Sequence, residues 1–398
     1  MKLNRLLLII LVCQILLLSG CWSSHEVNTL GITVCIGIDK TENGYLVSMQ
    51  ILNPATIASD KSARESPIVI YSVEVSNMAE VTGKIMLQLS RKINNAHLRL
   101  VVFGEDVARE GIENILDYLA RNHEFRTDYY FAVAKNSTAK EILGILTPIE
   151  TVPGVDMYNS IKISEEEWAS LKSMRIIELI NSIMADGKNP VLTGIEIEKN
   201  NKIDSNTTAV LERTDGYSLL KLSDSGAFNK DKLIGWLDEN ESKGYNYITG
   251  NVKRTLEDAQ IDEAKITSTI MKAKSDTKVH LSENEPSIEV KIKIEQNIAS
   301  IEGKFEISSK EQKRLLDEMF AVEIKSLCEK ALNKAQKELK TDIFGFGETI
   351  HRKYPKMWKK MKDNWDDIFP NLPVNITVEV DTKQLGGIGK PLFMKEEE

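Results

Sequence analysis

The chain has 398 residues, of which 42% are hydrophobic and 28% are charged, so it can form two or three domains with buried cores. Its formal net charge of −8 argues against a dedicated nucleic-acid-binding protein and against adhesion to anionic lipid by charge alone. The histidines and cysteines show no zinc-site spacing, and we expect no metal or other cofactor.

The first twenty residues have the three parts of a secretory signal peptide. Lys2 and Arg5 are followed by an apolar run over 6–18, and small residues then precede Cys21. The run of about 13 residues is shorter than the roughly 20 that a membrane-spanning helix needs. We therefore expect residues 1–20 to direct export and then to be removed.

The sequence Leu18-Ser19-Gly20-Cys21 predicts a lipid modification at the cleavage site. It resembles the bacterial lipobox, in which the cysteine thiol receives a diacylglyceryl group and the chain is cut before that cysteine. The resemblance implies an N-palmitoyl and S-diacylglyceryl cysteine at Cys21, and two acyl chains give stable membrane anchoring. The alternative is an uncleaved anchor or an ordinary signal peptide, and either would still place the rest of the chain outside the cytosol.

The region 21–200 alternates between strand and helix patterns and could contain two subdomains. Apolar residues at every second position predict a hairpin over 32–38 and 45–52. Further strands are predicted over 68–75, 98–104, 129–134 and 191–198, and helices over 77–91, 112–119, 138–146 and 164–185. A polar stretch then indicates a domain boundary near residue 200.

The region 201–392 is richer in signals for antiparallel strands, and 393–398 is a charged tail. We predict strands over 208–212, 217–222, 245–253, 287–296, 298–307 and 374–380 and a short helix over 229–239. Ser308 and Glu311 have the spacing of a capping box, which would start a long amphipathic helix reaching Leu339. The predicted fold class is α+β, with mixed and antiparallel sheets flanked by helices in two to three domains.

Two cysteines remain after Cys21, and neither has the surroundings of a reactive thiol. Cys35 lies in a strand-like run and Cys328 on the apolar face of the long helix, so we expect both to be buried small hydrophobes. A disulfide between them is left open. His97 precedes a buried strand, and we expect a structural histidine with satisfied hydrogen bonds.

Aromatic residues recur at helical spacing near the C-terminus, at Tyr354, Trp358, Trp365 and Phe369, with several lysines between them. The pattern predicts an amphipathic helix that packs its aromatic side chains on a sheet. The alternative is a site for a membrane partner or lipid headgroups, to which the lysines would contribute.

Several stretches of the mature chain, in this order and behind the lipobox, resemble those of one family. They are Leu30-Gly31-Ile32 with Gly37-Ile38-Asp39, Ala96-His97-Leu98-Arg99-Leu100, Asp342-Ile343-Phe344-Gly345-Phe346-Gly347, and Gly386-Gly387-Ile388-Gly389. The family is the Ger(x)C spore germination lipoproteins, the C subunits of germinant receptors in spore-forming Firmicutes.

The resemblance implies a non-enzymatic receptor component with an α+β architecture of about three domains. It would be anchored on the outer face of the spore inner membrane and work beside the membrane-embedded A and B subunits, so that nutrient binding triggers germination. No catalytic residue is carried over, and we do not expect this subunit to bind the germinant itself.

Two other classes of function fit a lipid-anchored protein. A solute-binding protein of a transporter would have a cleft between two similar lobes. A cell-wall hydrolase would need a catalytic arrangement, and the sequence offers none that we recognise.

Overall fold

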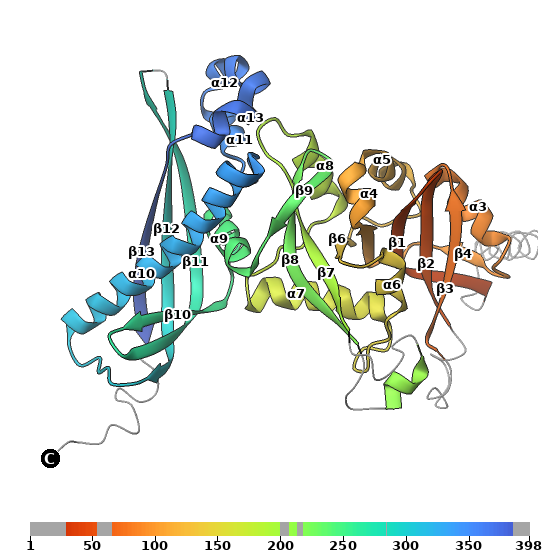
Figure 1. Ribbon diagram of the computed structural model, residues 1–398, viewed down its shortest axis with the longest axis horizontal. Helices are drawn as coiled ribbons and strands as arrows, with labels where there is room; N and C mark the ends of the chain where they lie inside the picture. Colours follow the sequence, from red (N-terminus) through yellow and green to blue (C-terminus); the bar gives the residue numbers. More distant parts are fainter. Residues whose placement is uncertain (1–28, 54–65, 200–206, 213–217, 284, 385–398) are drawn as a thin grey trace, which may run out of the picture.

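The computed structural model describes residues 29–53, 66–199, 207–212, 218–283 and 285–384. These residues form two mixed β-sheets that lie side by side, each flanked by helices, with the larger sheet at the right of Figure 1. The predicted α+β fold class is confirmed. The signal peptide, Cys21, the Gly386–Gly389 segment and the tail 393–398 lie outside the described residues.

The larger sheet has nine strands in the order β3-β2-β1-β5-β6-β7-β8-β9, with β4 paired to β1. Its strands are β1 (Leu30–Thr41), β2 (Gly44–Leu52), β3 (Ile68–Val75), β4 (Lys92–Asn94), β5 (Leu100–Gly104), β6 (Tyr130–Lys135), β7 (Val191–Glu198), β8 (Leu219–Asn229) and β9 (Lys232–Leu237). The strands β1, β5, β6 and β7 are parallel to one another, and antiparallel pairs flank them on both sides. The predicted hairpin, β1 with β2, is confirmed.

Helices cover both faces of the parallel strands, which explains why these strands read as continuous apolar runs. The helices are α3 (Val81–Met86), α4 (Glu105–Glu110), α5 (Glu113–Arg121), α6 (Ala139–Gly144), α7 (Pro153–Glu167) and α8 (Ile176–Met184). In β5, Val101 and Phe103 pack with α3, α4, α5 and α8, while Leu100 and Val102 face α6 and α7. Alternate residues of one strand therefore belong to two separate cores.

The larger sheet continues beyond residue 200. The strands β8 and β9 extend it through antiparallel pairing with β7. The predicted domain boundary near residue 200 therefore falls in a connection between two neighbouring strands of one sheet.

The smaller sheet has the order β10-β11-β12-β13. Its strands are β10 (Thr255–Ile261), β11 (Ala264–Ser282), β12 (Glu285–Glu302) and β13 (Val374–Gln384). Apolar residues of β12 such as Val290 and Ile292 are buried under α10 (Lys310–Asn333), which crosses one face of the sheet in Figure 1. The opposite face carries ion pairs between neighbouring strands, such as Lys272 with Glu295, as the alternation over 287–296 predicts.

The remaining helices connect the two sheets at one end of the smaller one. They are α9 (Glu239–Thr249), a π-helical turn at Lys334–Leu339, α11 (Phe346–Lys353), α12 (Pro355–Met361) and α13 (Trp365–Ile368). Short 3₁₀ turns lie at Met78–Glu80, Thr208–Glu212, Lys362–Asn364 and Phe369–Asn371.

Two predicted helices of the first region are wrong in extent. The helix predicted over 77–91 stops at Met86, because residues 92–94 pair with β1 as the short strand β4. The helix predicted over 164–185 is two helices, α7 and α8. The backbone of Ala169 is left-handed, with φ of 53°, so a right-handed helix cannot continue through it.

More of the second region was predicted wrongly. Residues 208–212 form a 3₁₀ turn instead of a strand, and the helix predicted over 229–239 is the strand β9. The strand predicted over 245–253 is largely the helix α9, which Asp238 caps at its start. The strand predicted over 298–307 is in its first part a continuation of β12 and not its partner.

The long helix was predicted correctly, but its start was not. The capping box is formed by Ser309 with Gln312 rather than by Ser308 with Glu311. The side chain of Ser309 accepts the backbone N–H of Gln312, and the Gln312 amide oxygen accepts the backbone N–H of Ser309.

Candidate functional site

One of the contacts between the two parts of the chain joins two loops. Gly187 lies in the loop between α8 and β7, and Gly347 follows the loop that starts at Asp342. The backbone N–H of Asn189 donates to the carbonyl of Asp342 at 2.9 Å, and the N–H of Glu348 donates to the carbonyl of Gly187 at 3.1 Å. We call this contact the junction.

Glycine is required on both sides of the junction. Gly187 has φ of +79°, and a β-carbon there would lie 2.5 Å from Cη2 of Trp358 and 2.7 Å from Cα of Gly347. A β-carbon on Gly347 would in turn lie 2.7 Å from Cα of Gly187. The two backbones therefore approach closely only because neither residue has a side chain.

A buried carboxylate organises the second loop. Asp342 is fully buried, and its side chain accepts five hydrogen bonds of 2.8–3.2 Å from the backbone N–H groups of Phe344, Gly345, Phe346 and Gly347 and from the indole N–H of Trp365. Burial raises the pKa of this carboxyl group from its ordinary value of 3.8 to about 6, while the N–H donors oppose that rise. The charge of Asp342 is thus held by four backbone N–H groups that follow it in the chain and by one indole N–H from α13.

The aromatic residues near the C-terminus form part of the core. Trp358, Trp365 and Phe369 are buried, and the two indole rings lie edge to face with their centres 5.1 Å apart. They come from three short helical segments instead of the single helix that their spacing predicted. The prediction that these side chains pack in a core is confirmed, and the lysines of α12 remain exposed around them.

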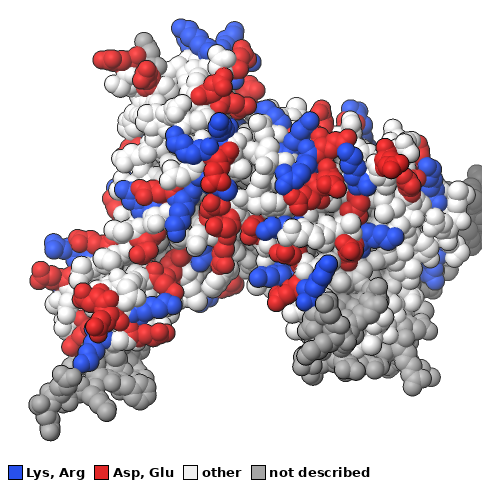
Figure 2. Space-filling model, viewed as in Figure 1, with Lys and Arg blue, Asp and Glu red and all other residues white. Residues whose placement is uncertain are grey.

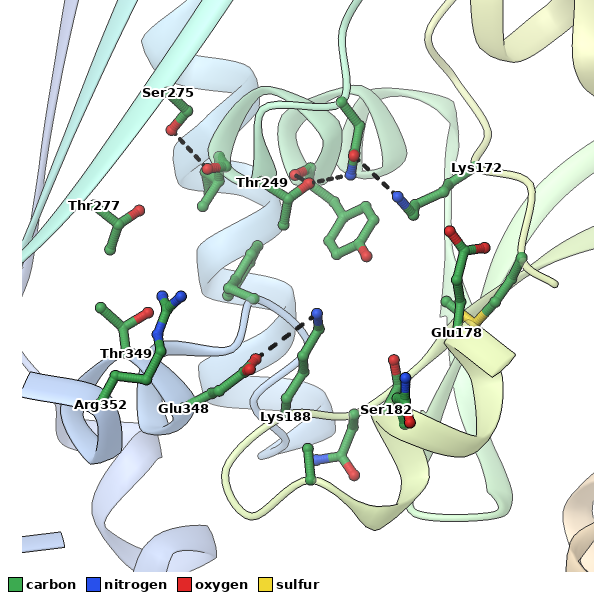
Figure 3. Close-up of a pocket in the computed structure, with 18 of the residues that line it drawn as sticks. Lys172, Glu178, Ser182, Lys188, Thr249, Ser275, Thr277, Glu348, Thr349 and Arg352 are labelled. Carbon is green, nitrogen blue, oxygen red and sulfur yellow. Dashed lines mark hydrogen bonds and ion pairs between the residues drawn. The ribbon is translucent and has the colours of Figure 1, made fainter. Parts of the chain in front are cut away.

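A cavity of about 570 Å³ opens beside the junction (Figure 3). Its lining comes from the segment 172–189, from α9, from β11 and from the loop and helix after Asp342. The lining is mostly polar and includes Lys172, Glu178, Lys188, Asn251, Thr249, Ser275, Asp276, Thr277, Glu348, Thr349 and Arg352. The smaller sheet contributes through β11, and the larger sheet contributes only through α8, which packs on it, and the loops beside that helix, so the cavity exists only in the assembled chain.

The charged groups of the cavity differ in how they are paired. The ammonium group of Lys172 donates to the amide oxygen of Asn251 at 2.9 Å, and Lys188 lies 3.9 Å from the carboxylate of Glu348. Figure 3 shows the side chain of Arg352 extending toward the open space, and no carboxylate in the described part of the chain forms an ion pair with it. The lining includes neither cysteine nor histidine, so it offers hydrogen bonds and charge but no thiol or imidazole.

A buried charge pair joins α9 to β10. The ammonium group of Lys243 is 3.6 Å from the carboxylate of Glu257, and less than a tenth of either side chain is exposed. The carboxylate also accepts the hydroxyl of Tyr247 at 3.0 Å, and the ammonium group lies 4.6 Å from the ring centre of Trp168. These contacts fix α9 against β10 and against the end of α7.

The residues that the sequence singled out do not gather at this site. Cys35 and Cys328 are buried as predicted, both are free thiols, and they belong to different cores. His97, expected to be a structural histidine with satisfied hydrogen bonds, is exposed in the turn before β5, where the neighbouring Leu98 takes the buried position. Cys21 is not among the described residues.

No sequence pattern pointed to the cavity residues. Lys172, Lys188 and Arg352 lie in a chain that is 28% charged, and none of them belongs to a recognisable motif. The Asp342–Gly347 stretch was noticed only through the family resemblance.

Neither a membrane span nor a metal site was found in the part of the chain that the structure describes. No helix there is long and apolar enough to cross a bilayer. Nor does any group of three or more His, Cys, Asp or Glu side chains in that part lie together as metal ligands would.

Known proteins match this chain along most of its length. The model "Spore germination protein N-terminal domain" matches residues 23–197, and "Spore germination B3/ GerAC like, C-terminal" matches residues 223–386. Spore germination protein KC of Bacillus subtilis is 30% identical over 97% of both chains, and spore germination protein B3 of the same organism is 20% identical over 95% of this chain and 97% of its own.

One solved structure, the crystal structure of the GerBC protein, superposes with a TM-score of 0.56 and 18% sequence identity. It covers 87% of this chain and 96% of that chain, so the two share a fold. The relative at 30% identity, together with the two family models, shows that the chain belongs to the GerAC-like family of spore germination proteins.

Proposed function

We propose that this protein is a lipid-anchored subunit of a spore nutrient germinant receptor. The observation that carries the proposal is the match to spore germination proteins over nearly the whole chain. The lipobox ending at Cys21 supports anchoring on the outer face of the spore inner membrane, where the A and B subunits would be its partners. In this function the chain requires both partners to trigger germination.

We propose a non-enzymatic role. The described residues form a polar cavity whose lining includes neither cysteine nor histidine. Both buried cysteine thiols have pKa values raised by desolvation, which disfavours the reactive thiolate. Figure 2 shows acidic and basic side chains intermixed over the visible face, which fits protein partners better than nucleic acid.

The test is co-purification from spore membranes. Tagged wild-type protein should bring down two membrane subunits and carry a lipid-modified Cys21 at its amino terminus, as measured by mass spectrometry. Cys21→Ala should lose the membrane fraction, the partners and nutrient-triggered germination together. Partners and germination that persist in the variant would refute the anchored-subunit proposal.

The cavity favours one second candidate, a lipid-anchored protein that captures a small solute. Its volume lies within the usual range of ligand sites, and Arg352 is positioned to bind a carboxylate or phosphate group. The two sheets are dissimilar, however, whereas a transporter's solute-binding protein was expected to have two similar lobes. Calorimetry of the unlipidated mature chain with candidate nutrients separates the two functions, since the receptor subunit should give no heat of binding.

A further inference from the structure

The lipid anchor would hold one corner of the larger sheet near the membrane. Between Cys21 and Leu30, where β1 begins, lie nine residue steps, which span at most about 30 Å when fully extended. The start of β1 pairs in parallel with β4, Leu30 opposite Lys92 and Gly31 opposite Ile93. The guanidinium of Arg91 also donates to the carbonyl of Leu30 at 3.5 Å. The elements α3 and β4 are therefore tied to the strand that follows the anchor.

This corner exposes apolar side chains at the end of α3. Val81 and Ile85 of that helix are buried in the core, whereas Met86 is 45% exposed and Leu87 is 87% exposed. Among the large apolar residues in the described ranges, only Ile149 is more exposed than Leu87. Exposed large apolar side chains that lie next to one another commonly mark an interaction surface.

The segment that carries these apolar side chains is basic. Residues 81–104 contain no aspartate or glutamate, although the whole chain has a net charge of −8. Lys84 of this stretch forms an ion pair with Glu80 at 2.7 Å, and Arg91 and Lys92 follow the apolar residues in the sequence. Apolar side chains flanked by basic groups favour the headgroup region of an anionic bilayer.

We propose that Met86, Leu87 and Arg91 form a membrane-contact surface that lies on anionic phospholipid headgroups. The proposal rests on the anchoring of Cys21 proposed above. The anchor brings the protein to the bilayer, and this surface then fixes its orientation, with the larger sheet next to the membrane and the smaller sheet away from it. In Figure 1, α3 and β4 lie at the opposite end of the molecule from α10.

The experiment uses the full lipidated protein in vesicles that contain phosphatidylglycerol. Leu87→Cys is labelled with an environment-sensitive fluorophore, and quenching by brominated lipid is measured. The matched control is Val322→Cys, a 59% exposed position on α10. Cys35 and Cys328 are buried, so the introduced thiol is the one that reacts with the dye.

We expect lipid quenching and a blue shift at position 87 and neither at position 322. Transfer of a leucine-sized group out of water changes its partition by about tenfold or more, enough to hold the probe at the interface. Phosphatidylcholine vesicles should weaken the quenching at position 87. Equal quenching at both positions, equal quenching in both lipids, or no quenching at position 87 would overturn the proposal.

Vesicle flotation separates this inference from the anchor on which it rests. A protein that does not float refutes the anchoring of Cys21. A protein that floats without quenching at position 87 leaves the anchor intact and refutes the membrane-contact surface.

Discussion

The close approach of two glycines at the junction predicts a large cost for a single methyl group. In Gly187→Ala the new β-carbon would lie 2.5 Å from Trp358 and 2.7 Å from Gly347, in a backbone with φ of +79°. A left-handed non-glycine residue costs about 1–2 kcal/mol, and overpacking of a closed site costs about 1–3 kcal/mol more. We therefore expect Gly187→Ala to lower the free energy of unfolding by about 2–5 kcal/mol.

Two other glycines separate these contributions. Gly250 has φ of +74° but its nearest neighbour, Cβ of Ser275, would be 3.5 Å from the new carbon, so Gly250→Ala should cost only about 1–2 kcal/mol. Gly83 lies in α3 with nothing within 4 Å, and Gly83→Ala should stabilise the protein by about 0.5–1 kcal/mol. Together the three variants isolate the steric cost at the junction.

The assay is urea unfolding of the unlipidated mature chain, followed by tryptophan fluorescence. Trp358 is buried against Gly187, so its emission reports on the junction. If the two loops of the junction separate before the rest of the chain unfolds, the fluorescence should show an additional transition at low urea concentration, because chains with several domains need not unfold in one step. If Gly187→Ala costs no more than Gly250→Ala, the reasoning from close packing is wrong.

Three further predictions concern the buried charges and thiols. Burial raises the pKa of Asp342 to about 6, so between about pH 4 and pH 6 the folded chain binds a proton that the unfolded chain has released. The wild-type protein should therefore lose about 3 kcal/mol of unfolding free energy as the pH rises from about 4 to about 6. Asp342→Asn has no carboxyl group to titrate and should not show this pH dependence. Unfolding curves of both proteins at each end of this pH range should therefore show that the difference in unfolding free energy, wild type minus variant, decreases as the pH rises. Glu257→Ala leaves Lys243 buried without its carboxylate and should cost about 3–5 kcal/mol in chemical denaturation, whereas a double replacement of the pair by apolar residues should be far milder. Cys35 and Cys328 should resist a thiol reagent in the folded protein and react on unfolding, and protection that persists in denaturant without reductant would indicate a disulfide.

Local periodicity was sufficient to predict the central strands of the larger sheet. The residues of β1, β5 and β6 carry strong apolar runs, and their burial on both faces follows from that composition. Their order in space follows the usual pairing of strand-helix-strand units. What periodicity did not reveal is that β8 and β9 continue this sheet beyond the polar stretch at residue 200.

The helix α9 shows why the second region was harder to predict. Tyr245, Tyr247 and Ile248 favour a strand by composition, yet Asp238 and Glu241 form a capping box and Gly250 provides a left-handed end. The end signals therefore outweighed the β-propensity of the residues between them. The strand β11 was not predicted from its sequence. It is long and has one solvent-facing side, and its many lysine, serine and threonine residues weaken the apolar alternation that would indicate a strand.

The cavity could not be predicted because its lining is brought together by tertiary structure alone. Lys172, Ser275 and Arg352 lie far apart along the chain and share no sequence motif. Asp342 is different, since a carboxylate followed by two Gly residues at 345 and 347 is a plausible loop-organising group. This loop could therefore be predicted from the sequence, whereas the loop of Gly187 against which it packs could not.

The strand order of the larger sheet limits how the junction can move relative to the anchor. The strand β1, which follows Cys21, and β7, which follows the loop of Gly187, are separated only by β5 and β6, and all four are parallel. Apolar side chains pack both faces of these strands, and close-packed cores resist small deformations. A displacement of the smaller sheet therefore has to occur at its contacts with the larger part, namely the contact of Gly187 with Gly347 and Trp358 and the hydrogen bonds of α9 and β10 to the end of α7.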